Sequence, residues 1–238
     1  MNELVAGIDL CDEYTQVNCN DEEKTWTFPT VLCRHKVSGT WSVGEDAYAQ
    51  TLRGEGSLTD KLVKLVLKEG TATLEGIRYT AVELLERFLE RVLWQVKKNL
   101  DTEAGFQELV FTVRSLDERL TEALYSCGEK LGVDRARIRI IGHTEGLIYY
   151  MLSQKKEIWS GNVGLFDLSE QELRYYELKV QRGLKQNAVL AEFERIEESF
   201  SLDILETPSG AKLGDKILCT CAERLMQRKL YSAVFLMG

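Results

Sequence analysis

The sequence lacks the features that would place the protein at a membrane or on nucleic acid. None of its 238 residues belong to an apolar run near the roughly 18 residues that a membrane-spanning helix requires. The start, "MNELVAGID", has no basic segment followed by an apolar one, so no secretory signal is expected. The formal net charge of -8 gives no electrostatic reason to expect nucleic acid. We therefore expect a cytoplasmic protein without membrane insertion.

Metal-binding, hydrolase and nucleotide-loop motifs are missing as well. The six cysteines form no Cys-x-x-Cys pair, and Cys219 and Cys221 fall on different faces of a predicted helix, so we expect reduced thiols and no cysteine-based metal site. His35 and His143 are the only histidines, and neither lies in a nucleophile motif, which argues against a hydrolase triad. No Walker-type "GxxxxGK" is present.

The apolar pattern that is present predicts a mixed α/β protein. In the N-terminal part, strands are expected over residues 4–9, 14–19, 26–33 and 41–44. The close spacing of the first three indicates an antiparallel meander, because parallel neighbours need crossovers of about a dozen residues or more. Pro29 indicates that the third strand lies at an edge or carries a bulge.

Strands and helices alternate in the rest of the chain. Further strands are expected over residues 109–113, 137–141, 163–168, 172–180, 184–196 and 231–237, and helices over residues 80–100, 115–131, 144–154 and 211–229. Two of the helices begin at a predicted capping box, Thr80-x-x-Glu83 and Ser115-x-x-Glu118. This order favours mixed sheets covered by helices.

A short internal repeat indicates that the fold is duplicated. "VAGIDLCDEY" at 5–14 aligns with "VGLFDLSEQE" at 163–172, so that Asp9 matches Asp167 and Leu10 matches Leu168. Each copy opens a run of three predicted strands that helices and further strands follow. We expect two related lobes, because a repeat of this kind changes the interpretation of a whole fold.

Several segments resemble the superfamily of actin, the sugar kinases and the heat-shock chaperone ATPases, in particular its chaperone-like members. "GIDL" at 7–10 and "VGLFDL" at 163–168 are similar to its two phosphate motifs, and "YSAVFLMG" at 231–238 is similar to the strand before its adenosine motif. The segments "FPTVLC" and "WSVGEDAYAQ" within 28–50, and the run from "ELVFTV" to "IYYML" at 108–152, follow the first domain of the chaperones.

This resemblance implies a duplicated actin-like, ribonuclease H-like α/β fold. It implies a first lobe over 1–157 and a second over 158–238, incomplete because no adenosine-type segment follows the last strand. In the superfamily each lobe offers a hairpin to the phosphates of ATP. The resemblance therefore implies that Asp9 and Asp167 would act through bound magnesium and water in an active member, and makes ATP with magnesium the alternative cofactor.

The two hairpins depart from the superfamily where the chemistry takes place. Glycine normally lets backbone amides approach phosphate oxygens, but neither hairpin contains one. Their turns are acidic. Two unit charges 4 Å apart interact by about 4 kcal/mol at an effective dielectric constant near 20. Two carboxylates that face a triphosphate would therefore repel it by several kcal/mol in total. The residues expected at the nucleotide cleft are Asp9, Leu10, Cys11, Asp12, Glu13, His143, Asp167, Ser169, Glu170 and Gly238.

The segment Gly142-His143-Thr144-Glu145 aligns with the superfamily's water-positioning carboxylate. In an active enzyme Glu145 would serve from a shifted position, or His143 would replace it. The structural alternative is that Thr144 caps a helix whose positive end favours Glu145.

These observations lead to three functional hypotheses. The first, which we favour, is a non-catalytic scaffold or regulatory interaction module. Such a module would need no cofactor and would bind an unidentified protein partner or form a homo-oligomer. The second is an ATP-binding chaperone-like or filament-forming ATPase that uses Asp9, Asp167 and Glu145. The third is a divalent cation site, for which the oxygen ligands would be Asp9, Asp12, Asp167 and Glu170.

Overall fold

The computed structural model describes most of the first part of the chain and the strands of the second. The described residues are 4–19, 24–153, 161–169, 172–182, 189–195, 200–201, 219, 223 and 232–237. The contacts divide the chain into two compact units, Met1–Tyr149 and Tyr150–Gly238. The lobe boundary expected between residues 157 and 158 lies outside the described residues.

A five-stranded mixed sheet forms the centre of the first unit. Its strands are β1 (Leu4–Leu10), β2 (Tyr14–Cys19), β3 (Thr25–Pro29), β9 (Phe106–Val113) and β10 (Ile138–Gly142). The spatial order is β10-β9-β1-β2-β3. β1 pairs antiparallel with β2 and parallel with β9, and β9 pairs parallel with β10. The predicted meander of the first three strands is confirmed, and Pro29 ends the edge strand β3.

The strand predicted over residues 26–33 is two strands in two sheets. β3 stops at Pro29, and β4 (Leu32–His35) pairs instead with β5 (Trp41–Val43) and β6 (Gly56–Thr59). The chain bends at Thr30, whose amide donates to the Glu13 carbonyl and whose buried hydroxyl lies 2.8 Å from that of Thr15. Alternation along the sequence continues through this bend, so the pattern alone did not show it.

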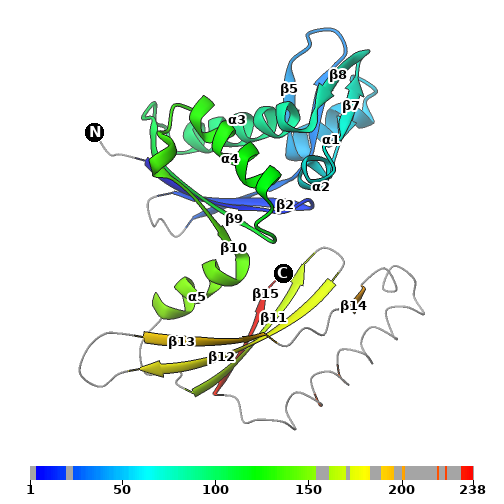
Figure 1. Cartoon of the computed structure of the whole chain (residues 1–238). Coiled ribbons are helices and arrows are strands. Elements are labelled where there is room, and N and C mark those ends of the chain that lie inside the picture. The colour runs from blue at the N-terminus through cyan, green and yellow to red at the C-terminus, as the bar shows by residue number, and fades with distance from the viewer. Residues whose placement is uncertain are drawn as a thin grey trace. The chain divides into compact units, whose positions relative to one another are not determined.

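Two long helices pack against the central sheet (Figure 1). The first, α3 (Ala81–Asn99), has the predicted capping box, because Thr80 Oγ1 accepts from the Glu83 amide and the Glu83 carboxylate accepts from the Thr80 amide. Its buried face centres on Phe88. The second helix, α4 (Glu118–Lys130), does not use the predicted Ser115 box. Asp117 caps it and accepts from the Arg119 amide.

Smaller elements complete the first unit. They are α1 (Gly44–Leu52), α2 (Leu62–Leu67), β7 (Thr71–Leu74), β8 (Ile77–Thr80), the 3-10 turn η1 (Arg135–Arg137) and α5 (His143–Ser153). The sequence pattern does not predict β6, α2 or the two strands of the β7–β8 hairpin, because these elements are only four to six residues long and carry little periodicity. Among the described residues, no helix combines the length and the apolar character that crossing a bilayer requires.

The second unit contains a mixed sheet of its own. Its strands are β11 (Gly161–Ser169), β12 (Glu172–Arg182), β13 (Val189–Arg195), β14 (Phe200–Ser201) and β15 (Ala233–Met237). The order is β13-β12-β11-β15, and β14 pairs with β12. β11 is antiparallel to β12 and parallel to β15. The helix predicted over residues 211–229 falls outside the described residues except at Cys219 and Glu223, which are helical.

Candidate functional site

The candidate site lies at one edge of the central sheet in the first unit. Asp9 is the penultimate residue of β1, Thr112 is the penultimate residue of β9, and His143 directly follows β10. The three strands are parallel, so their carboxyl ends meet at this edge. Ligands of open α/β sheets bind outside the carboxyl ends of the strands, so this edge is where a ligand is expected.

The Asp9 carboxylate is held by two hydrogen bonds at the same oxygen. Asp9 Oδ1 accepts from Thr112 Oγ1 at 2.7 Å and from His143 Nε2 at 2.9 Å. The His143 side chain is 6% exposed, whereas that of Asp9 is 47% exposed. The imidazole is therefore fixed inside the protein, while the carboxylate retains an open side toward solvent.

The surroundings of Asp9 favour its ionised form. Burial, the largest influence, raises the pKa of the carboxyl group, but the hydrogen bond and charge of His143 and the hydrogen bond from Thr112 hold the pKa below its ordinary value of 3.8. Asp9 is accordingly an anion at neutral pH, and its Oδ1 already accepts from two donors.

The first turn of α5 places His143. This helix begins at His143, so Thr144 lies inside its first turn and is not the predicted cap. A Cβ at Gly146 would lie 3.0 Å from Thr112 Cγ2, so glycine allows the turn to pack closely on the end of β9. Glu145 is exposed, and His143 and Thr112 donate to the Asp9 carboxylate. Of the two candidates for the water-positioning role, only His143 contacts Asp9.

Cys11 completes a group of three potential ligands. It opens the turn between β1 and β2, where its amide donates to the Tyr14 carbonyl. Its Sγ lies 3.8 Å from His143 Nε2, and one ligand atom each from Asp9, Cys11 and His143 lies within 4.8 Å of the others. Asp9 and Cys11 approach the same ring nitrogen. This is not a nucleophile triad, which needs the thiol and the carboxylate on opposite ring nitrogens.

The structure corrects the expected role of Asp12. Its carboxylate is buried and accepts hydrogen bonds from two backbone amides of α2, from Val63 at 2.8 Å and from Lys64 at 3.1 Å. The residue before the helix, Lys61, has a left-handed backbone with φ of 52° and offers no side-chain cap. Asp12 thus caps α2 from a distant turn, and it is not the cleft or cation residue that the sequence suggested.

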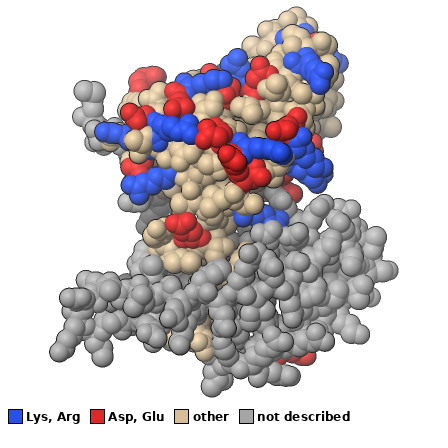
Figure 2. Space-filling model, viewed as in Figure 1, with Lys and Arg blue, Asp and Glu red and all other residues tan. Residues whose placement is uncertain are grey.

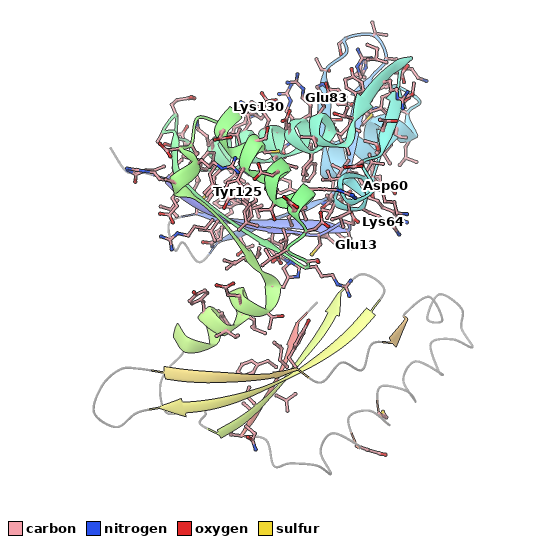
Figure 3. The ribbon with its side chains drawn as sticks, in the orientation of Figure 1. Glu13, Asp60, Lys64, Glu83, Tyr125 and Lys130 are labelled. Atoms are coloured by element: carbon pink, nitrogen blue, oxygen red, sulfur yellow. The ribbon has the colours of Figure 1, made fainter. Side chains whose placement is uncertain are left out.

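Two other residues of this hairpin that were predicted at the cleft have different surroundings from Asp9. Leu10 is 1% exposed and belongs to the hydrophobic core. Glu13 is exposed and lies with Lys64 and Asp60 at the end of the unit where the turn meets α2 (Figure 3). The hairpin therefore brings together only Asp9 and Cys11 from the predicted set, with His143 from α5.

Asp167 in the second unit has strand-pairing partners that correspond to those of Asp9 in the first. Asp9 faces Gln16 in the antiparallel neighbour and Thr112 in the parallel one. Asp167 faces Arg174 and Met237 in the same two relationships. Ser169 ends β11 opposite Glu172, whereas Glu170 and Gly238 lie outside the described residues.

The outer face of the first unit carries charges of both signs. Figure 2 shows Lys and Arg interspersed with Asp and Glu over this face, and no large patch of one sign appears on its described residues. Lys130 pairs with Glu86 at 2.6 Å and Arg135 with Glu122 at 2.5 Å. Arg135 also lies 4.1 Å from the ring centre of Tyr125. On the described part of this face, charges of opposite sign thus lie close to one another.

A family model described as "Family of unknown function (DUF5716) C-terminal" matches residues 13–238. The chain belongs to this family. The DUF5716 C-terminal match includes Thr112 and His143 and begins just after Asp9 and Cys11. Among curated proteins, no significant sequence match was found.

Proposed function

We propose that this DUF5716 C-terminal chain is a non-catalytic, actin-like module that serves as a scaffold or regulatory interaction domain. The strand arrangement supports this proposal. In the first unit the strands lie in the order β3-β2-β1-β9, where the first two neighbouring pairs are antiparallel and the last pair is parallel. The strands β13-β12-β11-β15 of the second unit have the same order of pairings. A duplicated fold with one aspartate at the end of each leading strand is what the superfamily resemblance implies.

The contacts of Asp9 carry the non-catalytic part of the proposal. In an active member this carboxylate would hold magnesium through water, but here His143 Nε2 and Thr112 Oγ1 both donate to its Oδ1. Magnesium needs an octahedral shell of oxygen ligands and water, and a buried imidazole beside the carboxylate occupies part of that space. The Cys11–Tyr14 turn also lacks the glycine that would let backbone amides reach a phosphate.

The structure changes the electrostatic part of this argument. Asp12 faces the amides of α2 and does not add to the repulsion of a triphosphate. Loss of the phosphate site therefore rests on the Asp9–His143 pair and the glycine-free turn more than on an acidic rim. A module without a nucleotide would act by binding a protein partner in the cytoplasm, or a second copy of itself, with no role for nucleic acid or membrane insertion.

The alternative function is a chaperone-like or filament-forming ATPase. The observation that favours it is the matched register of Asp9 and Asp167, each at the end of a strand with a parallel neighbour. An ATPase of this kind would show turnover that falls when either aspartate is replaced by alanine.

Isothermal titration of the full chain with ATP and magnesium tests the proposed function. We expect no binding heat at micromolar concentrations of the protein, because the first hairpin offers no phosphate cradle. A micromolar dissociation constant would refute the non-catalytic assignment. The Asp9→Ala and Asp167→Ala variants would then decide for the ATPase if both weaken binding and slow hydrolysis, and against it if the hydrolysis rate does not change.

A further inference from the structure

We propose that Asp9, Cys11 and His143 form a binding site for one zinc-class divalent transition-metal ion. The three side chains come from the end of β1, the β1–β2 turn and the start of α5. Their ligand atoms already lie within 4.8 Å of one another. The site uses the same Asp9–His143 pair that argues against a nucleotide in the proposed function, but transition-metal binding is measured separately from nucleotide binding.

The ligand set selects the class of metal. A thiolate and an imidazole are ligands that zinc and its neighbours in the transition series prefer, and one carboxylate oxygen is also common in such sites. Magnesium and calcium would need several more oxygen ligands than Asp9 and Thr112 supply. The chemistry of the group therefore differs from the all-oxygen cation site that the sequence suggested for Asp9, Asp12, Asp167 and Glu170.

Two of the three separations between the ligand atoms compare with those of a tetrahedral site. Metal–ligand bonds of about 2.0–2.3 Å at tetrahedral angles separate neighbouring ligand atoms by about 3.3–3.8 Å. Cys11 Sγ and His143 Nε2 are 3.8 Å apart, and Asp9 Oδ1 and His143 Nε2 are 2.9 Å apart. The thiol and imidazole thus have the required separation, and the carboxylate needs to withdraw by a few tenths of an ångström.

Metal binding would replace the protons that now hold the group together. The proton on His143 Nε2 moves to Nδ1 in a neutral ring, or is released to solvent from a charged ring that keeps its Nδ1 proton. The Cys11 thiol releases its proton to solvent, and both atoms then direct a lone pair at the ion. Thr112 Oγ1 remains a donor to Asp9 and orients the carboxylate from outside the ligand set. Three protein ligands leave a fourth position, which water would fill.

The local structure holds the ligands before a metal arrives. The turn that carries Cys11 is closed by the bond from its amide to the Tyr14 carbonyl, and Asp12 anchors the same turn on α2. His143 is 7% exposed at the start of a helix that Gly146 keeps close to β9. Ligands on fixed elements lose little conformational entropy on binding, which favours affinity.

Cobalt substitution of the full chain tests the site. The protein is freed of metal by chelation, titrated with Co²⁺, and followed by thiolate-to-cobalt charge-transfer absorption in the near ultraviolet and by the visible bands of a tetrahedral ion. Zn²⁺ competition then gives the zinc affinity. We expect one equivalent per chain, with the affinity falling at least about 100-fold in Cys11→Ser and His143→Gln and about 10-fold in Thr112→Val.

Cys219→Ser is the matched control, because this cysteine is exposed in the second unit and outside the group. It should bind cobalt with the wild-type spectrum. Absence of a charge-transfer band in the wild-type chain overturns the proposal without reference to any variant. The proposal also fails if Cys11→Ser keeps the band, or if Cys219→Ser loses it. Circular dichroism of each variant shows whether it has folded, and nucleotide titration remains a separate readout of the proposed function.

Discussion

Asp9 and Asp12 lie three positions apart in one acidic segment but have different partners. Asp9 Oδ1 accepts from His143 and Thr112 at the edge of the sheet, whereas Asp12 accepts from two amides of α2. β1 ends between them, at Leu10. The two side chains therefore need not follow the alternation of the strand, and they lie in different environments. One segment of sequence therefore contains both a candidate ligand and a structural cap.

Replacing Asp12 by alanine should destabilise the first unit. The substitution leaves two helix amides without their charged acceptor in a buried position, and we expect a loss of about 1–3 kcal/mol in the free energy of unfolding. Urea denaturation of the full chain measures it. Asp12→Asn keeps an acceptor oxygen and should lose less, whereas the exposed neighbour Glu13→Ala should stay within about 0.5 kcal/mol of wild type. Equal losses for Asp12→Ala and Glu13→Ala would contradict the cap.

At the scale of elements, the start of α4 shows how a capping motif can misplace a helix. Ser115-x-x-Glu118 satisfies the sequence signature of a capping box, but the helix begins at Glu118 and Asp117 accepts from the Arg119 amide. Both residues are good caps by type, so residue identity does not choose between them. The position of β9, which ends at Val113, and the buried face that includes Leu120 set where the helix begins.

The two candidate caps of α4 make a direct comparison. Asp117→Ala should lower the free energy of unfolding by about 1 kcal/mol, because the first turn loses its side-chain acceptor. Ser115→Ala should change it by less than about 0.5 kcal/mol, since Ser115 is exposed before the helix. Thermal unfolding of the two variants beside wild type measures the difference. A larger loss in Ser115→Ala would restore the capping box that the sequence suggested.

At the scale of the whole molecule, each unit has its own sheet, and one hydrophobic core joins the sheet of the first unit to α2, α3 and α4. Phe88 lies fully buried in this core and is among its largest side chains. The edge that carries Asp9 and His143 depends on this packing, because α3 and α4 hold the strands whose ends form it. Stability of the core and geometry of the site are thus linked.

Phe88→Ala should therefore weaken the whole first unit. Removing a large buried aromatic side chain leaves a cavity and typically costs about 3–5 kcal/mol. Three of the four tryptophans, Trp26, Trp41 and Trp94, lie in this unit, and Trp159 belongs to the second. In a Trp159→Phe background, tryptophan fluorescence during denaturation therefore reports the transition of the first unit. Arg87→Ala is the control on the exposed side of the same helix and should move the transition by less than about 0.5 kcal/mol. Similar midpoints for Phe88→Ala and wild type would show that this core does not hold the unit together.

The sequence by itself determined the features that depend on neighbouring residues. The helical spacing of apolar residues and the Thr80–Glu83 box located α3, and alternation with short connections predicted the meander of β1, β2 and β3. These signals arise within one element or between adjacent elements, where side-chain periodicity and local hydrogen bonds are decisive. The repeat around Asp9 and Asp167 was also visible as a pattern, and their matched positions in the strand pairing support it.

Only the tertiary structure decided what those residues contact. Cys11 and His143 are 132 positions apart, and Asp12 is 51 positions from the amide of Val63. No local pattern encodes such pairs, because they form when parallel strands bring their carboxyl ends to one edge and when a turn packs on a helix elsewhere in the chain. For that reason only the structure shows that Asp9 accepts from His143 and Thr112. It also shows that Asp12, in the same acidic segment, caps α2.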